Sequence, residues 1–462
     1  MAREIEIDVM VLGGGGGGYP AAFRLAKAGR RVVMADPIGN LGGNCLAEGC
    51  VPSKAVREAG LARAFAVKYP AFGLRGAVPE ADWRGVVAHK DRVQNIRYAQ
   101  HKAEIEASAL TLLQGEGRIL DEHTVEVATK DGEVIRYRAG SLIIATGSRP
   151  HRLPIPGAEL AVTSHDFFRV GATLPFPGRL AVIGGGYIGL ETASMLQNLG
   201  AKAAVLEAAP QILPGADPDL ATFLHGALAR RMEIVVNAKV TAIERTGGEL
   251  RVLYETKEGR NQMSADCVLM AAGREPALPP GIATLGFPPG DKIPADSRLR
   301  TPLRRVYAPG DVNGRSMLFH SAVCQSLIAA EDILTEGQGV AEMNFLSVPF
   351  TVFTEPEVAW AGLTAAGAAQ QGLKIATSLY DYRTDSRAQI FGETEGFINL
   401  VFDTATGRLM GAQIAGLDAA QVIAPLALAI HTGTTARTLS YMAFPHPMLS
   451  EGINKAARKF CL

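Results

Sequence analysis

Residues 7–18 read IDVMVLGGGGGG, an apolar run that passes directly into six glycines. The apolar part, residues 7–12, has the composition of a buried strand, and the glycines satisfy the spacing G-x-G-x-x-G. Residues 19–28 then have helix-like composition before Gly29, and a second apolar strand, residues 32–35, ends on Asp36. This order predicts a βαβ unit that binds a dinucleotide, because glycines let the backbone approach a pyrophosphate and the acid accepts ribose hydroxyls. The fingerprint glycines are Gly13, Gly15 and Gly18.

The same pattern occurs a second time in the chain. An apolar strand at residues 180–183 is followed by three fingerprint glycines, a helix that ends at Leu199, and a strand at residues 203–206 that ends on Glu207. The first glycine and the acid are 23 residues apart in both copies. A glycine-rich turn that binds no ligand would not be expected to repeat strand, helix and acid at this spacing, so we predict two dinucleotide sites. The second set of glycines is Gly184, Gly186 and Gly189.

The acid of the second copy bears on which dinucleotide binds there. A carboxylate at Glu207 would repel the 2′-phosphate of NADP, and no arginine follows closely enough to bind that phosphate. We therefore predict NAD at the second site. The first site lies beside a pair of cysteines and is predicted to bind FAD.

That cysteine pair lies in residues 42–54, GGNCLAEGCVPSK. Four residues separate Cys45 from Cys50, a span that one helical turn or a tight loop can bring to disulfide distance. A zinc site would need a second pair, whereas Cys267, Cys324 and Cys461 are scattered singly. A structural disulfide is not expected in a cytoplasmic chain. We therefore predict a redox pair and no metal site.

Length and composition limit the remaining possibilities. A chain of 462 residues predicts two to four domains, and 46 basic residues balance 46 acidic ones, which gives no reason to expect nucleic acid or an anionic membrane as a partner. The N-terminal residues lack the pattern of a signal peptide. Residues 419–430 are apolar but are interrupted by Gln421 and Pro425, and they are too short to span a membrane. We expect a soluble, cytoplasmic protein.

The run G-G-x-C-x-x-x-x-C-V-P-S-K after an FAD fingerprint resembles the class I pyridine nucleotide–disulfide oxidoreductases. The resemblance continues through residues 145–147 (ATG), 273–274 (GR), 308–312 (APGDV), 353–358 (FTEPEV) and 446–451 (HPMLSE). It implies an α/β fold with two Rossmann-like dinucleotide-binding domains, for FAD and NAD, and a C-terminal α+β dimerisation domain. The implied domains are an FAD-binding domain (1–150), an NAD-binding domain (151–274), a return segment that completes the FAD domain (275–345), and the interface domain of a homodimer (346–462).

The resemblance also assigns the catalytic residues. It makes Cys50 the thiolate next to the flavin and Cys45 the sulfur that meets the substrate. Lys54 would lie near the flavin and pair with Glu191 of the NAD domain. His446 would be the general acid–base, supplied by one subunit to the cysteines of the other, with Glu451 orienting it; such a group is needed because dithiol oxidation removes a proton from the attacking sulfur.

Cofactor contacts follow from the same resemblance. Asp36 would hold the ribose of FAD, Asp311 would contact another polar group of that cofactor, and residues 317–320 would touch it mainly through their backbone. The FAD set is Gly13, Gly15, Gly18, Asp36, Asn44, Lys54, Gly117, Thr146, Gly147, Asp311, Met317, Leu318, Phe319 and His320. The NAD set is Gly184, Gly186, Gly189, Glu207, Val240 and Gly273.

Substrate is indicated less directly. Ser53 and the NAD reading of Glu207 favour the dihydrolipoamide dehydrogenase branch of the family, with lipoamide or a lipoyl-bearing carrier protein as substrate. Phe444 and Met448, which flank His446, and Asn44, Ala47 and Glu48, which lie around the cysteines, depart from that branch's usual pattern. A reductase of mercuric ion or of a small-molecule disulfide therefore remains an alternative, although mercuric reductases carry a C-terminal cysteine pair. A non-enzymatic flavin- and NAD-binding scaffold or sensor subunit is a third possibility.

Overall fold

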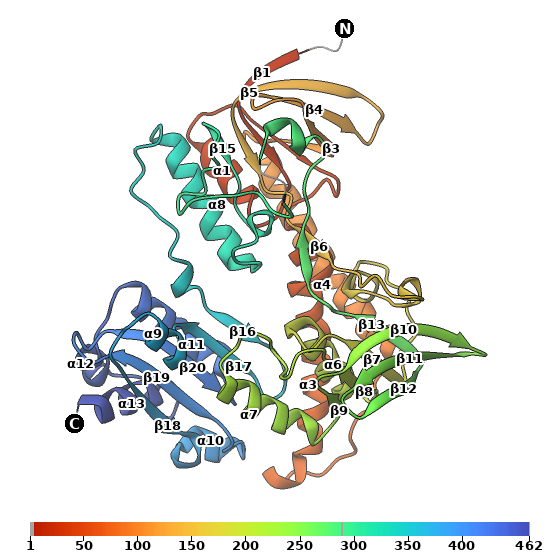
Figure 1. Ribbon diagram of the computed structural model, residues 1–462, viewed down its shortest axis with the longest axis vertical. Helices are drawn as coiled ribbons and strands as arrows, with labels where there is room; N and C mark the ends of the chain where they lie inside the picture. Colours follow the sequence, from red (N-terminus) through yellow and green to blue (C-terminus); the bar gives the residue numbers. More distant parts are fainter. Residues whose placement is uncertain (1–3, 288–289, 462) are drawn as a thin grey trace.

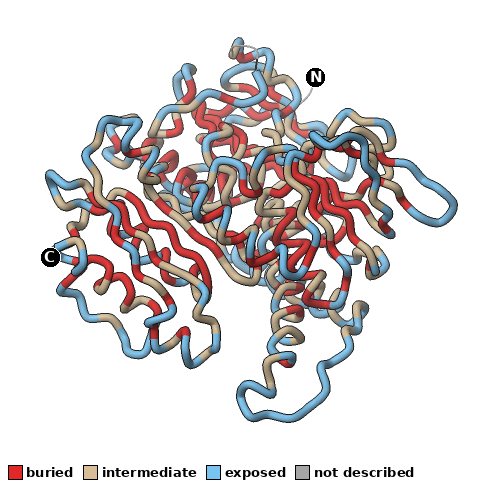
Figure 2. Tube along the Cα trace, turned by 60° about the horizontal axis from the view of Figure 1, so that its bottom comes forward, coloured by how far each residue is buried: buried red, intermediate tan, exposed pale blue. Residues whose placement is uncertain are grey.

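A computed structural model describes residues 4–287 and 290–461. The chain forms three units, which Figure 1 shows with the N-terminal domain at the top, the middle domain at the lower right and the C-terminal domain at the lower left. Each unit has its own sheet and a buried apolar core, and the buried strands form the red centres in Figure 2. This confirms the predicted fold class.

The N-terminal domain contains a mostly parallel sheet in which only the pairings of one strand are antiparallel. β1 (Glu4–Leu12) lies between β2 (Val32–Asp36) and β5 (Val134–Ile144). β3 (Thr111–Ile119) follows β2, and the antiparallel β4 (Thr124–Thr129) joins β3 to β5. The apolar runs that predict β1 and β2 account for the complete burial of β2 and of the last four residues of β1.

The other edge of this sheet comes from much later in the chain. β15 (Val306–Tyr307) pairs in parallel with β5, and α8 (Phe319–Leu334) packs against α1 (Tyr19–Lys27). Residues beyond the middle domain therefore return to the N-terminal domain and bring the segment before α8 up to the first glycine loop.

The cysteine segment forms two helices with a break between them. α2 (Gly43–Glu48) and α3 (Cys50–Val67) are separated by Gly49, whose backbone is not helical (φ −126°, ψ −112°). α3 packs against α4 (Trp83–Glu106). It also packs against α6 (Tyr187–Leu199), which belongs to the middle domain. The loop between α3 and α4 projects from the molecule and is largely exposed (Figure 2).

The middle domain repeats the parallel βαβ arrangement. Its sheet has the order β13 (Cys267–Met270), β7 (Arg179–Ile183), β8 (Lys202–Leu206) and β9 (Glu233–Val235). A separate antiparallel sheet and two further helices complete the domain: β10 (Lys239–Thr246), β11 (Glu249–Thr256), β12 (Gly259–Ala265), α5 (Ser164–Phe168) and α7 (Pro218–Ala229).

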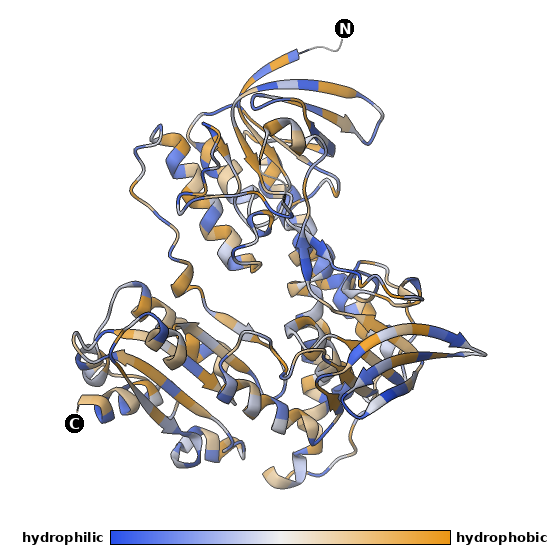
Figure 3. Cartoon of the chain, viewed as in Figure 1, coloured by the Kyte–Doolittle hydropathy of each residue, from blue (hydrophilic) through white to orange (hydrophobic). Residues whose placement is uncertain are grey.

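Two short strands carry the chain between these domains. β6 (Ser148–Pro150) and β14 (Arg274–Pro276) pair antiparallel and form a hydrophilic connection, blue in Figure 3. The crossings fall near the expected domain ends at residues 150 and 274, although the boundaries themselves stay a prediction.

The C-terminal domain has a five-stranded antiparallel sheet. Its order is β16 (Phe350–Val352), β17 (Val358–Gly362), β20 (Leu409–Ala415), β19 (Phe397–Asp403) and β18 (Ile375–Asp381). The helices of this domain are α9 (Ala365–Gln370), α10 (Ser386–Phe391), α11 (Ala419–His431), α12 (Ala436–Tyr441) and α13 (Glu451–Cys461). The apolar run considered above is α11, and across the described part of the chain no helix has the length and apolarity to cross a membrane.

Candidate active site

Both glycine loops are tied to the acid that follows them in the same way. Asp36 accepts hydrogen bonds from the backbone N–H of Gly14 (2.7 Å) and from the backbone N–H two residues after itself (2.8 Å). Glu207 accepts the corresponding bonds, from the backbone N–H of Gly185 (2.6 Å) and from the backbone N–H two residues after itself (2.7 Å). The two predicted dinucleotide units therefore match in three dimensions as well as in sequence.

The first glycine of each loop is required by its conformation. Gly13 and Gly184 have φ values of +103° and +110°, and a Cβ atom on either would lie 2.3 Å from a backbone carbonyl oxygen. The middle glycine is different, because a Cβ on Gly186 would meet nothing within 4 Å and one on Gly15 only a Cα at 3.6 Å. These positions leave the outer side of each loop open to a ligand.

Each loop borders a large cavity. The first cavity is bordered by the first glycine loop, the cysteine segment and the return segment. The second follows the second loop and includes Gly184, Gly186, Glu207, Val240 and Gly273. Four residues line both cavities, so that the two spaces meet: Tyr187, Ile188, Arg274 and Met317.

The lining of the first cavity matches a dinucleotide whose ring system carries hydrogen-bonding groups. Asn44, Lys54, Gly147 and Asp311 line it, and their donors and acceptors surround an otherwise apolar space. The hydroxyl oxygen of Thr146 is buried and has no hydrogen-bond partner within the described residues, which is expected where a ligand supplies one. The residues present therefore fit FAD.

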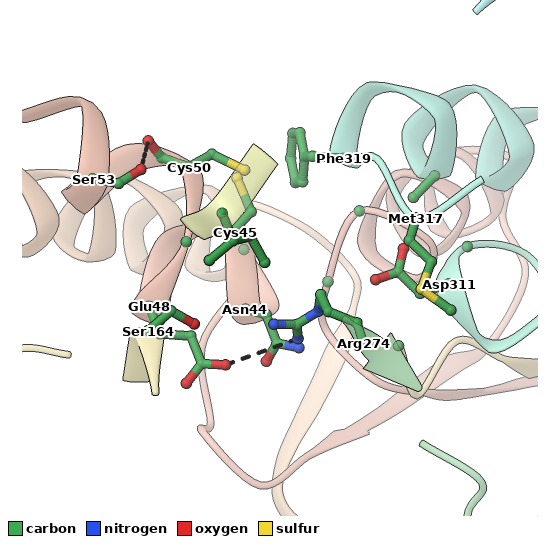
Figure 4. Close-up of a pocket in the computed structure, with 18 of the residues that line it drawn as sticks. Asn44, Cys45, Glu48, Cys50, Ser53, Ser164, Arg274, Asp311, Met317 and Phe319 are labelled. Carbon is green, nitrogen blue, oxygen red and sulfur yellow. Dashed lines mark hydrogen bonds and ion pairs between the residues drawn. The ribbon is translucent and has the colours of Figure 1, made fainter. Parts of the chain in front are cut away.

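The two cysteines meet at the wall of this cavity. Cys45 belongs to α2, Cys50 is the first residue of α3, and their sulfur atoms point toward each other in Figure 4. Both are free thiols in the structure. The interruption of the helix at Gly49 makes this approach possible, because it lets α3 start in a new direction.

The two sulfurs have different acidities. A hydrogen bond with Cys50 and then burial raise the pKa of the Cys45 thiol. The same hydrogen bond lowers the pKa of Cys50, burial opposes this, and the positive charge of Lys54 lowers it further. The first turn of α3 also offers free N–H groups to a thiolate at Cys50. Cys50 is consequently the better site for negative charge.

Lys54 and Glu191 form the pair expected between the first two domains. Lys54 Nζ lies 2.6 Å from Glu191 Oε2, and Glu191 Oε1 accepts a 3.0 Å hydrogen bond from the backbone N–H of Phe353. The ammonium group also lies 4.4 Å from the centre of the Phe353 ring. This arrangement holds the cation beside the cysteine pair and links all three domains.

His446 and Glu451 also pair, but away from the cysteines. His446 Nδ1 lies 2.9 Å from Glu451 Oε2, and the histidine side chain is 70% exposed. The pair lies between α12 and α13, at the left edge of Figure 1, whereas α3 runs through the centre. One chain does not bring His446 to Cys45. Three exposed apolar side chains lie near His446 in the sequence: Tyr441, Met442 and Met448.

Some of the other predicted cofactor residues face the cavities and others do not. Met317 lines both cavities, Leu318 only the second and Phe319 only the first. His320 lines neither, because its Nε2 lies 2.8 Å from the carbonyl oxygen of Pro349. Gly117 lies within β3, packed against the side chain of Leu12 on β1, and it lines neither cavity.

Two residues at this site, Glu48 and Tyr187, have surroundings that no sequence pattern predicted. Glu48 accepts a hydrogen bond from His165, and its other carboxylate oxygen lies 4.0 Å from Arg274. Tyr187 stands between the two cavities, and burial raises the pKa of its phenol to about 12. More than 100 residues separate Glu48 from either partner, so no sequence spacing could have revealed the contact.

Comparison with known proteins agrees with this geometry. The family model described as pyridine nucleotide-disulphide oxidoreductase matches residues 7–326, and that of its dimerisation domain matches residues 348–457. The chain belongs to this family. A dihydrolipoyl dehydrogenase of Staphylococcus aureus is 33% identical over 98% of this chain and 97% of its own length. One from Bacillus subtilis is 34% identical over 98% and 96%.

Solved structures show the same fold. An HOCl-induced flavoprotein disulfide reductase from Escherichia coli, determined as its Cu(II) complex, has a TM-score of 0.86 and 25% identity over 98% of this chain and 99% of its own. LpdA from Mycobacterium tuberculosis has a TM-score of 0.88 and 26% identity over 98% and 100%. The chain is thus an FAD-dependent disulfide oxidoreductase that uses FAD and NAD, and its dimerisation domain supports a homodimer.

Proposed function

We propose that this enzyme is a dihydrolipoyl dehydrogenase, which exchanges electrons between dihydrolipoyl groups and NAD through Cys45 and Cys50. The observation that carries the proposal is the pair of unequal thiols at a cavity that continues into the second dinucleotide cavity. The names of relatives that match along nearly their whole length support the choice of substrate.

The residues divide the work in this proposal. Cys45 forms the mixed disulfide with the substrate, and Cys50, whose pKa is lowered, then carries the thiolate. FAD, when bound, converts this two-electron thiol chemistry into hydride exchange with NAD. Lys54 supplies positive charge beside Cys50, while Asp36 and Glu207 orient the two glycine loops.

Proton transfer is assigned to His446. The hydrogen bond from its Nδ1 to Glu451 leaves Nε2 on the opposite edge of an exposed ring, free to take a proton from a substrate thiol. Since the histidine is remote from its own cysteines, we propose that it serves those of a second subunit. A cytoplasmic location and a lipoyl-bearing carrier protein as partner complete the proposal.

A second candidate is a reductase that acts on another acceptor. The similarity to an HOCl-induced disulfide reductase and the charged Glu48 beside the redox pair favour it. Under this alternative the same cysteines and cofactors act, and only the group that meets Cys45 differs.

Parallel assays would decide between these candidates. Holoenzyme would be tested with NADH and lipoamide, a lipoylated carrier domain, oxidised glutathione, coenzyme A disulfide, mercuric ion and Cu(II). The proposal expects the lipoyl substrates to give the highest kcat/KM. Inert lipoyl substrates together with turnover of another acceptor would reject it in favour of the second candidate.

A further inference from the structure

Glu48 is a carboxylate placed where the redox chemistry occurs. It lies three residues after Cys45, one turn along α2, and both side chains line the first cavity. The residue is only 9% exposed. An acidic side chain this buried is normally paired, because removing its charge from water is costly.

Two basic groups supply the pairing. His165 Nδ1 contacts one oxygen of Glu48, and the guanidinium of Arg274 lies 4.0 Å from the other. Arg274 is itself fixed, since it donates hydrogen bonds of 2.8 Å to the hydroxyl and to the carbonyl oxygen of Ser148. Figure 4 shows Arg274 between Glu48 and Asp311, across the floor of the cavity from the cysteines.

The contact between Glu48 and His165 is held by a helix behind it. Gln94 of α4, fully buried, donates to the carbonyl oxygens of Leu46 and Ala47 at the end of α2. Lys90, also fully buried, donates to Gln94 and to the carbonyl oxygens of Phe168 and Arg169, just after His165. One face of α4 therefore fixes both backbone segments that carry the contact.

A charge in this position acts on the equilibrium between disulfide and dithiol. Reduction puts a thiolate at Cys50, and a carboxylate nearby in a partly dry cavity disfavours added negative charge. His165 and Arg274 offset that carboxylate. The three groups therefore act on the sulfurs through their net charge, which adds to the effects of Lys54 and Glu191.

We propose that the charge of Glu48, partly offset by His165 and Arg274, sets the reduction potential of the Cys45–Cys50 pair. The inference rests on the proposed redox role of these cysteines and extends it. It assigns to this chain an electrostatic control that lies in the same subunit as the cysteines, separate from the partner subunit's histidine.

The test reaction exchanges electrons with glutathione. Two glutathione thiols give two electrons and two protons, the bond between Cys45 Sγ and Cys50 Sγ breaks, and glutathione disulfide forms. Cys45 keeps a proton, while Cys50 remains a thiolate and releases its proton to solvent. Holoenzyme would be equilibrated at pH 6.0 over a range of glutathione ratios, quenched with acid and alkylated, and peptide mapping would count reduced Cys45 and Cys50.

Opposite effects are expected from the two partners. Glu48→Gln keeps the shape but removes the negative charge, so the equilibrium constant for reduction should rise about three- to tenfold. His165→Gln keeps a hydrogen-bond donor but removes the basic side chain that faces Glu48, so the constant should fall about two- to fivefold. In a Glu48→Gln background the histidine change should have less effect, because the two act as a pair.

The matched control is Glu58→Gln, an exposed carboxylate on α3 whose loss should leave the constant unchanged. Equal constants in the parent and in Glu48→Gln, or shifts of the same sign in both single variants, would overturn the inference. Failure of the parent pair to form a disulfide at any glutathione ratio would instead reject the proposed redox role itself.

Discussion

Lys54 donates a 2.6 Å hydrogen bond to Glu191, which joins the helix that follows the cysteines to the helix that follows the second glycine loop. The ammonium lowers the pKa of Cys50, whereas the carboxylate raises it. The two members of one ion pair thus act on the same sulfur in opposite directions.

Replacing Lys54 by methionine should therefore raise the pKa of Cys50, and replacing Glu191 by glutamine should lower it. Only thiolate reacts with iodoacetamide, so the pH at which the alkylation rate of Cys50 in reduced enzyme is half-maximal should move up in the first variant and down in the second. Rate profiles over pH 5 to 9 would measure this. Profiles that coincide with the parent's would show that the pair only joins the domains.

Separate replacement of the two cysteines should distinguish their roles. Cys45→Ser should abolish turnover of disulfide substrates but leave the enzyme able to accept electrons from NADH, measured as anaerobic NADH consumption in a single turnover. Cys50→Ser should also abolish disulfide turnover, while its remaining Cys45 keeps the pKa of a buried thiol and alkylates slowly. Disulfide turnover by Cys45→Ser would contradict the mechanism.

Mixed dimers should test the two-subunit site. Cys45→Ser and His446→Gln homodimers should each lose about 100-fold or more in kcat. When differently tagged subunits are unfolded together and refolded, half the dimers are mixed, and each mixed dimer has one site with an intact Cys45 and an intact His446. Recovered activity of about one quarter of the parent's supports the arrangement, whereas no recovery places both residues in a single chain's site.

Glu207 should control the choice of nicotinamide cofactor. Glu207→Ala removes both a ribose acceptor and the negative charge that repels a 2′-phosphate, so kcat/KM for NADH should fall and the ratio of NADH to NADPH should decrease about 10- to 100-fold. Asp36, the equivalent acid of the first unit, provides the contrast. Asp36→Ala should lower the FAD content, measured by absorbance after gel filtration, without altering that ratio in the molecules that retain FAD.

The duplicated units could be predicted because their signals are local. Strand, glycine turn, helix and acid follow one another within about 30 residues, and each observed element ends within one or two residues of its expected end. The contact between Lys54 and Glu191 was also expected, but only through family resemblance, since 137 residues separate the two side chains.

The surroundings of the redox pair could not be predicted in this way. His165 reaches Glu48 only because α5 begins near α2, and α5 itself is a short helix whose start is fixed by a capping box between Thr163 and Asp166. Likewise, His320 was expected to touch the cofactor mainly through its backbone, and the sequence did not indicate that its ring turns to the carbonyl oxygen of Pro349. Side-chain direction at a helix start depends on tertiary neighbours that the sequence pattern does not specify.

Buried side chains of α4 form hydrogen bonds with the main chain of the cysteine segment and with that of Leu41, just before it. Gln94 contacts the carbonyl oxygens of Leu46 and Ala47, and His101 contacts that of Leu41. These hydrogen bonds do not depend on which side chains the segment carries, because they are made to backbone carbonyl oxygens. The residues between and beside the two sulfurs are therefore free to diverge without moving the sulfurs, which gives evolution a way to retune the chemistry or the acceptor on an unchanged frame.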